Sequence, residues 1–249
     1  MVGKNMASNP MHQFEVYRVG PQINFGEINL SFTNASLFMV ISAITILFFL
    51  FLGTQKKLLV PSKMQLIAEM SYTFVAKMIN DTAGNNAKPF FPFIFTLFMF
   101  VLFCNMIGML PYSFTVTSHI IVTFVLAAVV FIGVTIIGFI KHGIKYLELF
   151  VPKGVPIMLL PLIVIIEIIS YLSRPVSLSV RLFANMMAGH TMLKVFGGFV
   201  ISLGLLGGWL PLSFSVALTG LEILVAFLQA YVFAILTCIY LNDALNLHH

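Results

Sequence analysis

The chain has 249 residues, of which 60% are hydrophobic and only 8% charged. Soluble domains carry roughly 25% charged residues, so this chain has too few polar side chains to cover a water-soluble fold of its length. Its formal net charge of +5 comes from lysines and arginines that are spread thinly and form no patch for nucleic acid. Composition excludes a soluble enzyme and a disordered chain, and it predicts an integral membrane protein.

The N-terminal segment, residues 1–35, is mostly polar and has no cleavable-signal pattern. Apolar runs that can cross a bilayer as helices follow at 36–53, 90–110 and 118–140. The alternation of polar and apolar residues that is typical of membrane β-strands is absent. The predicted fold class is therefore all-α and polytopic.

A segment of different character, residues 61–80, separates the first two runs. Ile67, Met70 and Phe74 fall on one helical face, whereas Gln65 and Glu69 lie elsewhere. This pattern predicts an amphipathic helix that lies in the membrane interface, in contact with lipid, rather than crossing it.

The last two apolar runs, 157–199 and 212–241, are longer than an upright crossing needs. At 1.5 Å per residue they correspond to about 65 and 45 Å of helix, against a hydrocarbon core of about 30 Å. They must tilt, kink or break, and Pro175 is a candidate for a kink in the first. We expect a long, steeply tilted hairpin whose turn lies in the glycine-rich stretch 200–211.

The loops differ in charge, which predicts the orientation. The loops at 111–117 and 200–211 have no charged residue, whereas the first and third loops hold Lys56, Lys57, Lys63, Lys77, Lys88, Lys141, Lys145 and Lys153. By the positive-inside rule the lysine-bearing loops are cytoplasmic. Five crossings then place residues 1–35 outside and the C-terminus in the cytoplasm, with residues 36–249 as a single membrane domain.

Ionisable residues inside the apolar runs cost roughly 2.5–3.5 kcal/mol each on insertion scales, so each needs an explanation. The set comprises Glu167, Arg174, Arg181, His190, Lys194 and Glu222. Arg181 keeps its proton at physiological pH, so it can attract or repel a charge but cannot carry protons. His190 and Glu222, in contrast, can take up and release protons near neutral pH in a suitable environment.

The hairpin predicts which of these residues face each other. His190 and Glu222 lie at nearly equal sequence separations from the centre of the predicted turn, and the same count matches Arg181 with Gln229. We therefore expect an acid–base pair nearer the outside and an arginine–glutamine layer deeper in the membrane. A structural alternative has Arg181 merely hydrogen-bonded to neighbours such as Asn185 on its own helix.

Other polar residues leave two alternatives open. Asn105 and His119 could line a water path or make helix-packing contacts. Arg174 could form an internal ion pair with Glu167 near the cytoplasmic side. The chain has no Walker-type motif, and we expect no metal and no cofactor.

Three sequence motifs resemble one family. Residues 173–190 read SRPVSLSVRLFANMMAGH, residues 105–111 read NMIGMLP, and residues 221–241 include Glu222 and Gln229. Together they resemble the signatures of subunit a of the F-type ATP synthase membrane sector. The resemblance covers roughly residues 90–242.

This resemblance implies a stator proton-channel subunit that is not itself catalytic for nucleotide. Arg181 would face the carboxyl groups of a rotating c-subunit ring and separate two offset half-channels. The residues along the proton path would be His190, Glu222 and Asn185 on the outer side, Glu167 and Ser170 near the inner side, and Gln229 beside Arg181, with Asn105 and His119 as further candidates. Implied partners are the c ring, b-type peripheral stalk subunits, the rest of the ATP synthase and lipid of a bacterial plasma (inner) membrane, but no nucleic acid.

The chain departs from the pattern of some family members at two places. Some bacterial members have Glu at the position of His190 and His at that of Glu222, so the acid–base pair is kept with its members exchanged. Some also carry Asp at the position of Gly108. Any channel role of that aspartate is therefore absent from this chain or belongs to another residue.

Two functions from other classes compete with this hypothesis. A secondary cation–proton antiporter also needs buried charges, but such folds usually show inverted repeats, and none is evident. A non-transporting scaffold predicts that apolar replacements of the four layered residues, Arg181, His190, Glu222 and Gln229, affect stability alone.

Overall fold

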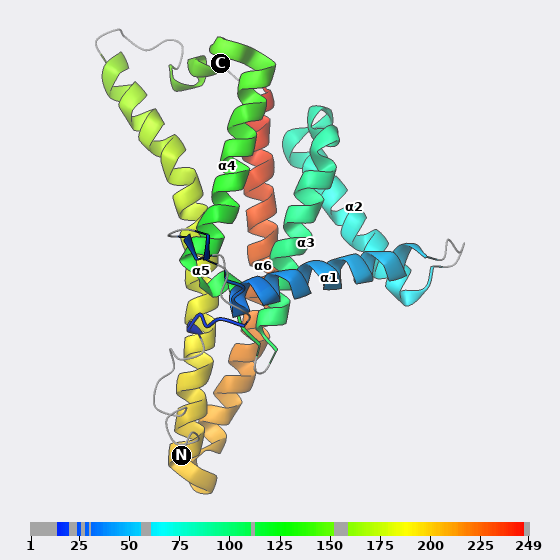
Figure 1. Cartoon of the computed structure of the whole chain (residues 1–249), viewed down its shortest axis with the longest axis vertical. Coiled ribbons are helices and arrows are strands. Elements are labelled where there is room, and N and C mark those ends of the chain that lie inside the picture. Colours follow the sequence, from blue (N-terminus) through cyan, green and yellow to red (C-terminus); the bar gives the residue numbers. More distant parts are fainter. Residues whose placement is uncertain are drawn as a thin grey trace. The chain divides into compact units, whose positions relative to one another are not determined.

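The computed structural model describes residues 14–19, 24–25, 28–29, 31–55, 61–110, 113–151 and 159–246. Five apolar segments among these residues are long enough to cross a membrane, so the protein is an all-α polytopic membrane protein (Figure 1). Their helices are α1 (Asn34–Thr54), α3 (Phe91–Gly108) preceded by η2 (Asn85–Phe90), α4 (Ile120–His142), α5 (Leu160–Gly207) and α6 (Trp209–Leu245).

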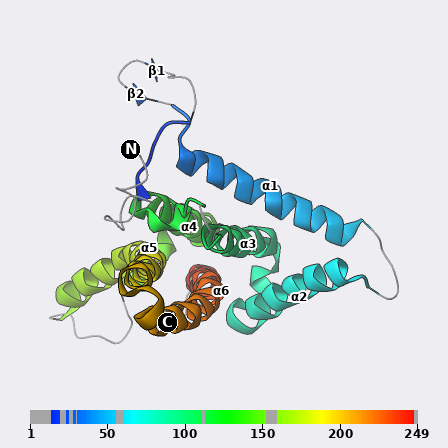
Figure 2. The same ribbon diagram turned by 90° about the horizontal axis from the view of Figure 1, so that it is seen from below.

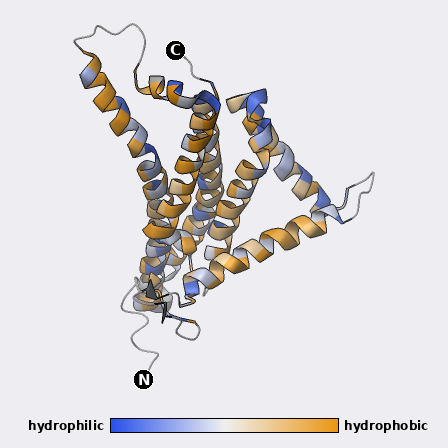
Figure 3. Ribbon diagram, turned by 45° about the horizontal axis from the view of Figure 1, so that its top comes forward, coloured by the Kyte–Doolittle hydropathy of each residue, from blue (hydrophilic) through white to orange (hydrophobic). Residues whose placement is uncertain are grey.

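Apolar side chains cover the outside of these helices. Leu47, Ile140 and Ile201 are 67%, 80% and 77% exposed. Figure 3 shows hydrophobic colour over long runs of the helices. Such surfaces suit contact with lipid or with another apolar protein surface, because every helix satisfies its own backbone hydrogen bonds.

The amphipathic segment forms α2 (Lys63–Ala83). The side chain of Ser62 caps its first turn, and Gly84 follows its last turn with a φ of 68° that glycine adopts without strain. Val75 and Ile79 are buried, whereas Met64, Ile67 and Met70 on the rest of the helix are exposed. The buried residues therefore lie on a different side of α2 from the predicted apolar face, and the placement of this helix in the membrane interface stays a prediction.

Short elements complete the described chain. Strands β1 (Asn24–Phe25) and β2 (Ile28–Asn29) pair antiparallel beside the start of α1 (Figure 2). Two residues per strand are too few to build a core, so the class remains all-α. The 3-10 helices η3 (Val116–Ser118) and η4 (Gly143–Phe150) precede and follow α4.

Helices α5 and α6 have 48 and 37 residues and extend into the predicted turn from both sides. They correspond to about 70 and 55 Å of helix, so neither can cross an apolar core of about 30 Å upright along its whole length. Helical dihedral angles continue through Pro175 and break at Gly204, where φ is 63°. This break lies within the predicted turn 200–211, and α6 begins at Trp209.

The chain divides into two compact units. The first unit comprises Met1–Phe51, Met99–His119 and Leu182–Ala230, and the second comprises Leu52–Phe98, Ile120–Arg181 and Tyr231–His249.

In the first unit the second half of α5 packs against the first half of α6 (Figure 1). Met186 of α5 and the small residues Ala226 and Ala230 of α6 are fully buried. The rings of Phe196 and Phe214 stack with centroids 6.0 Å apart. Small side chains allow two helices to approach closely, which positions the polar residues described below.

In the second unit α2 packs on α3 through aromatic side chains. The ring centroids of Tyr72 and Phe91 are 4.6 Å apart, and those of Phe74 and Phe98 are 5.7 Å apart. Aromatic pairs of this kind contribute about 0.5–1.5 kcal/mol beyond the area that they bury. They hold the amphipathic helix to a membrane-length helix.

Candidate functional site

The first unit brings together an acid and a base from the two arms of the hairpin. His190 Nδ1 on α5 lies 3.4 Å from Glu222 Oε1 on α6, and the two side chains are only 11% and 3% exposed. Neither carboxyl oxygen has a hydrogen-bond partner of good geometry among the described residues. The two groups are therefore close enough to exchange a proton after a small movement, directly or through one water.

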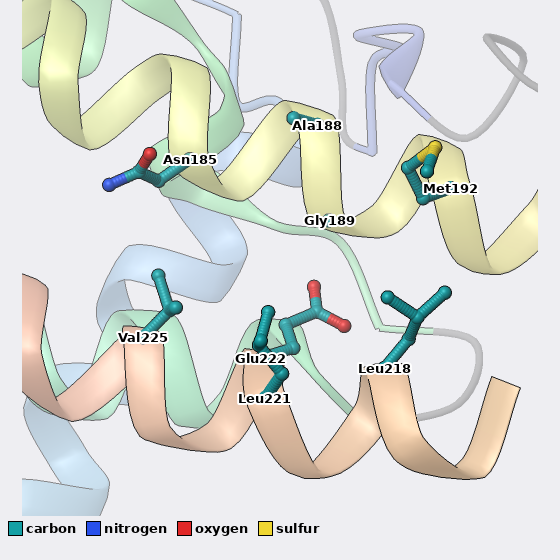
Figure 4. Close-up of a pocket in the computed structure, with 8 residues that line it drawn as sticks. All are labelled: Asn185, Ala188, Gly189, Met192, Leu218, Leu221, Glu222 and Val225. Atoms are coloured by element: carbon teal, nitrogen blue, oxygen red, sulfur yellow. The ribbon is translucent and has the colours of Figure 1, made fainter. Parts of the chain in front are cut away.

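A glycine makes room for this carboxyl group. A Cβ atom added at Gly189 would lie 2.8 Å from Glu222 Oε1 and 3.1 Å from its Cδ. Figure 4 shows the Glu222 carboxyl directed from α6 toward α5 beside Gly189. Any side chain at position 189 would displace the carboxyl, so glycine is the residue that fits here.

A cavity of about 250 Å³ opens beside the carboxyl group. Its lining comes from both arms of the hairpin and consists of Asn185, Ala188, Gly189, Met192, Leu218, Leu221, Glu222 and Val225 (Figure 4). Glu222 is the charged residue among them. The cavity is large enough for several waters, each of which needs about 30 Å³, so the carboxyl can meet water or a partner's side chain.

An amide pair lies farther along the same two helices. Asn185 Nδ2 donates a hydrogen bond to Gln229 Oε1 at 2.9 Å. Gln229 is buried, and Asn185 is exposed on α5. The structure thus joins Gln229 to Asn185, and the expected layer of Gln229 with Arg181 stays a prediction.

Arg181 lies on α5 four residues before Asn185 and belongs to the second unit. Its side chain is exposed, and only 11% of the most apolar window of α5 is buried. The helix therefore presents a charged residue on a largely uncovered apolar surface.

Thr115 also contributes to the site, although it was not among the residues predicted from the sequence. Its Oγ1 lies 3.0 Å from His190 Nε2 and also donates a hydrogen bond to the Gly108 carbonyl at 3.2 Å. The residue is buried in the loop between α3 and α4. The signal that could have revealed it is the run of hydroxyl residues in 113–118 directly before His119.

The two weaker candidates occupy different environments in the first unit. Asn105 Nδ2 donates to the Ala226 carbonyl at 3.2 Å, which is a helix-packing contact between α3 and α6. His119 stacks on the Phe114 ring with centroids 4.8 Å apart. Burial lowers the pKa of His119, which favours its neutral form at pH 7. Their places in a proton path remain predictions.

The expected inner-side residues lie in the second unit. Glu167 is partly exposed, and Ser170 is exposed with its carbonyl accepting a hydrogen bond from Ser173 Oγ at 2.7 Å. Arg174 does not pair with Glu167, which was the structural alternative for this arginine. Its Nη1 lies 3.1 Å from Asp243 Oδ2 of α6.

Arg174 is also held by two aromatic rings. Its guanidinium carbon lies 5.4 Å from the centroid of Tyr171 and 5.0 Å from that of Tyr240. Arginine suits such a site because it can pair with a carboxylate while stacking on aromatic faces. Arg174, Asp243, Tyr171 and Tyr240 form what we call the α5–α6 clamp.

Comparison with known proteins points to one family. A family model described as ATP synthase A chain matches residues 36–242. The chain is 79% identical over 244 residues to ATP synthase subunit a of Pelagibacter ubique (strain HTCC1062), covering 98% of this chain and 100% of the relative. It is 60% identical over 250 residues to ATP synthase subunit a of Chelativorans sp. (strain BNC1), covering 98% and 100%. The corresponding protein of Parvibaculum lavamentivorans is 58% identical over 253 residues, covering 99% and 97%.

Proposed function

The chain belongs to the ATP synthase subunit a family, and we propose that it is the stator proton-channel subunit of an F-type ATP synthase. As a member of that complex it takes part in proton transport and ATP synthesis. The observation that carries the proposal is the buried acid–base pair, His190 and Glu222, between the two arms of an apolar hairpin. The subunit itself would have no catalytic role toward nucleotide.

The outer half-channel is proposed to run along the first unit. The cavity beside Glu222 and the adjacent His190 supply groups that can accept and release a proton inside an apolar helix pair. Asn185 and Gln229 follow along the same helices, and their amide pair can orient water without adding charge. Asn105 and His119 are proposed as further polar contacts of this path.

Arg181 is proposed to be the barrier between the outer and the inner half-channel. A guanidinium keeps its proton, so protons cannot hop through it, and it favours the ionised form of a carboxyl group that comes near. Its exposure on the largely uncovered surface of α5 supports a partner that carries carboxyl groups within the membrane. We propose that this partner is the rotating c-subunit ring, with Glu167 and Ser170 near the inner half-channel.

The same reasoning gives a proposed placement in the cell. Lysine-bearing loops face the cytoplasm by the positive-inside rule, so residues 1–35 lie outside and the C-terminus lies inside a bacterial plasma membrane. The proposed neighbours besides the ring are the b-type peripheral stalk subunits and the remaining subunits of the synthase.

The test is Arg181→Ala in the assembled ATP synthase. We expect ATP-driven acidification of inverted membrane vesicles to fall to background while immunoblots show normal incorporation of the subunit. The reason is that rotation of the ring no longer meets a fixed charge that forces its carboxyl groups to release protons. Acidification at near-normal rates would contradict the proposal.

The chain offers a matched control in Arg174→Ala. Arg174 lies on the same helix, but its charge is already paired with Asp243. We expect pumping per assembled complex to stay close to wild type in this variant, even where the amount of complex falls. Equal loss of pumping per complex in both variants would indicate that Arg181, like Arg174, has only a structural role.

A further inference from the structure

A buried hydroxyl group contacts the side of His190 that faces away from Glu222. Thr115 is only 5% exposed, and its Oγ1 makes two polar contacts, with His190 Nε2 at 3.0 Å and with the Gly108 carbonyl at 3.2 Å. His190 is therefore held between a threonine at one ring nitrogen and a glutamate at the other.

The protons in these contacts can be assigned by counting donors and acceptors. A threonine hydroxyl has one hydrogen, the Gly108 carbonyl can only accept, and a histidine ring nitrogen can donate or accept. Both contacts of Thr115 are hydrogen bonds only when its hydrogen points to the carbonyl. Ser113 Oγ, which also has one hydrogen, lies 2.9 Å from the Gly108 oxygen and 2.7 Å from the Leu110 carbonyl, and a carbonyl has two lone pairs, so Ser113 does not compete with Thr115 for Gly108. The Thr115 oxygen consequently meets His190 Nε2 with a lone pair, and the ring must donate from Nε2.

We propose that Thr115 is a positioning residue that holds neutral His190 as its Nε2–H tautomer, so that the lone pair of Nδ1 faces Glu222. Its relevance to proton flow rests on the proposed function of the His190–Glu222 pair. The histidine tautomer itself is a property of the fold and can be measured independently.

This tautomer allows a proton to pass between the two residues without reorientation of the ring. In one state Glu222 is protonated and His190 is neutral. When the proton moves from the carboxyl oxygen to Nδ1, Glu222 becomes a carboxylate and His190 an imidazolium that still donates from Nε2 to Thr115. The net charge of the pair is zero in both states, which limits the desolvation cost in an apolar hairpin. The opposite tautomer would present N–H to Glu222 and could accept no proton there.

The surroundings of Thr115 hold it in place. A Cβ atom at Gly108 would lie 2.7 Å from Thr115 Cγ2 and 3.1 Å from its Oγ1, so the glycine permits the close approach. The preceding residue, Phe114, packs on Phe38 of α1 with centroids 6.2 Å apart. These contacts fix the position of the loop, and with it the position of Thr115 beside the hairpin.

The experiment compares Thr115→Val with Thr115→Ser and Thr117→Val in the assembled complex. Valine keeps the shape and removes the hydroxyl, and serine restores it. Thr117 is a matched control because it is buried in the same loop. The ¹⁵N chemical shifts of histidine-labelled complex report the tautomer, with the signal of His190, one of six histidines, assigned by its loss in His190→Gln.

We expect Nε2–H at His190 in the wild type, in Thr115→Ser and in Thr117→Val. Because one hydrogen bond is lost, we expect Thr115→Val to shift the tautomer ratio on the order of five- to tenfold and to lower ATP-driven pumping by a similar factor. Nδ1–H in the wild type, or an unchanged ratio in Thr115→Val, would overturn the inference. If the tautomer shifts but His190→Gln pumps normally, the positioning role stands and the proposed proton path fails.

Gly108→Ala provides a second variant that leaves Thr115 itself intact. The added methyl group must push Thr115 away, so we expect the same change in tautomer as in Thr115→Val. Gly133→Ala is its control, because nothing lies within 4 Å of a Cβ atom there. A wild-type tautomer in a correctly incorporated Gly108→Ala complex would contradict the inference.

Discussion

At the residue scale, the main question is how a carboxyl group is tolerated inside an apolar hairpin. Glu222 is 3% exposed, and its oxygens have no well-formed hydrogen bond within the described part of the chain. A buried carboxylate without partners is costly, whereas Glu222 has a histidine ring nitrogen 3.4 Å away and a cavity beside it, and each of them can lower that cost. A carboxyl group whose hydrogen bonds are incomplete is better suited to proton transfer than to a permanent structural role.

The exchange of the two residues tests whether they act as one unit. We expect His190→Glu combined with Glu222→His to retain more ATP-driven pumping than either His190→Ala or Glu222→Ala, because the exchange keeps one acid and one base at the same two helices. Pumping is measured by acidification of inverted vesicles at equal subunit content. Equal loss in all three variants would show that the two residues work separately.

At the element scale, the α5–α6 clamp fixes the second half of α6 to the first half of α5 within the second unit. Arg174 bonds Asp243, and Lys141 Nζ from the end of α4 donates to the Leu245 carbonyl at 3.0 Å. The same carbonyl lies 3.2 Å from His142 Nε2. These contacts satisfy carbonyl and carboxylate groups at a helix C-terminus, where cations are favourable.

A double-mutant cycle on the clamp measures its contribution. The Arg174 and Asp243 side chains are 22% and 35% exposed, so we expect a coupling energy of only about 0.5–1 kcal/mol between Arg174→Ala and Asp243→Ala. The free energy of unfolding in mixed micelles is the measurement. Additive effects of the two changes would show that the ion pair does not contribute to the free energy of unfolding. Glu167→Ala, which lies outside the clamp, serves as the control.

At the scale of the whole molecule, the described helices leave most of their apolar surface uncovered. Only 11% of the most apolar window is buried in α1 and in α5, compared with 39% in α6. Lipid can cover α1, but α5 also carries exposed Arg181, which lipid tails cannot satisfy. The site is therefore expected to be complete only when a partner with carboxyl groups covers this helix.

That dependence distinguishes a stator subunit from an antiporter. We expect the purified chain alone in liposomes to show no cation-dependent proton movement, whereas the complete synthase in the same lipid pumps protons on addition of ATP. A fluorescent pH indicator inside the vesicles measures both. Proton exchange by the isolated chain that requires a sodium or potassium gradient would favour the antiporter.

The sequence alone was sufficient for the fold class, the presence of a helix at 61–80 and the family. These depend on local quantities, namely the hydrophobicity of a run, the helical period and a contiguous motif, which tertiary packing does not change. It also predicted that His190 and Glu222 lie at the same depth, since an antiparallel hairpin with a short turn pairs residues at equal separations. The break at Gly204 lies within the predicted turn 200–211. Its exact position in this stretch was less predictable, because glycine permits either helix or chain reversal.

The tertiary structure decided which polar groups touch. Asn185 bonds Gln229, Arg174 bonds Asp243 rather than Glu167, and Thr115 reaches His190. These partners are 44, 69 and 75 residues apart in the chain. Such contacts depend on the rotation of each helix about its axis and on the path of a returning loop. Both are set by the packing of many side chains at once, so the proton-handling geometry emerges only when the helices assemble.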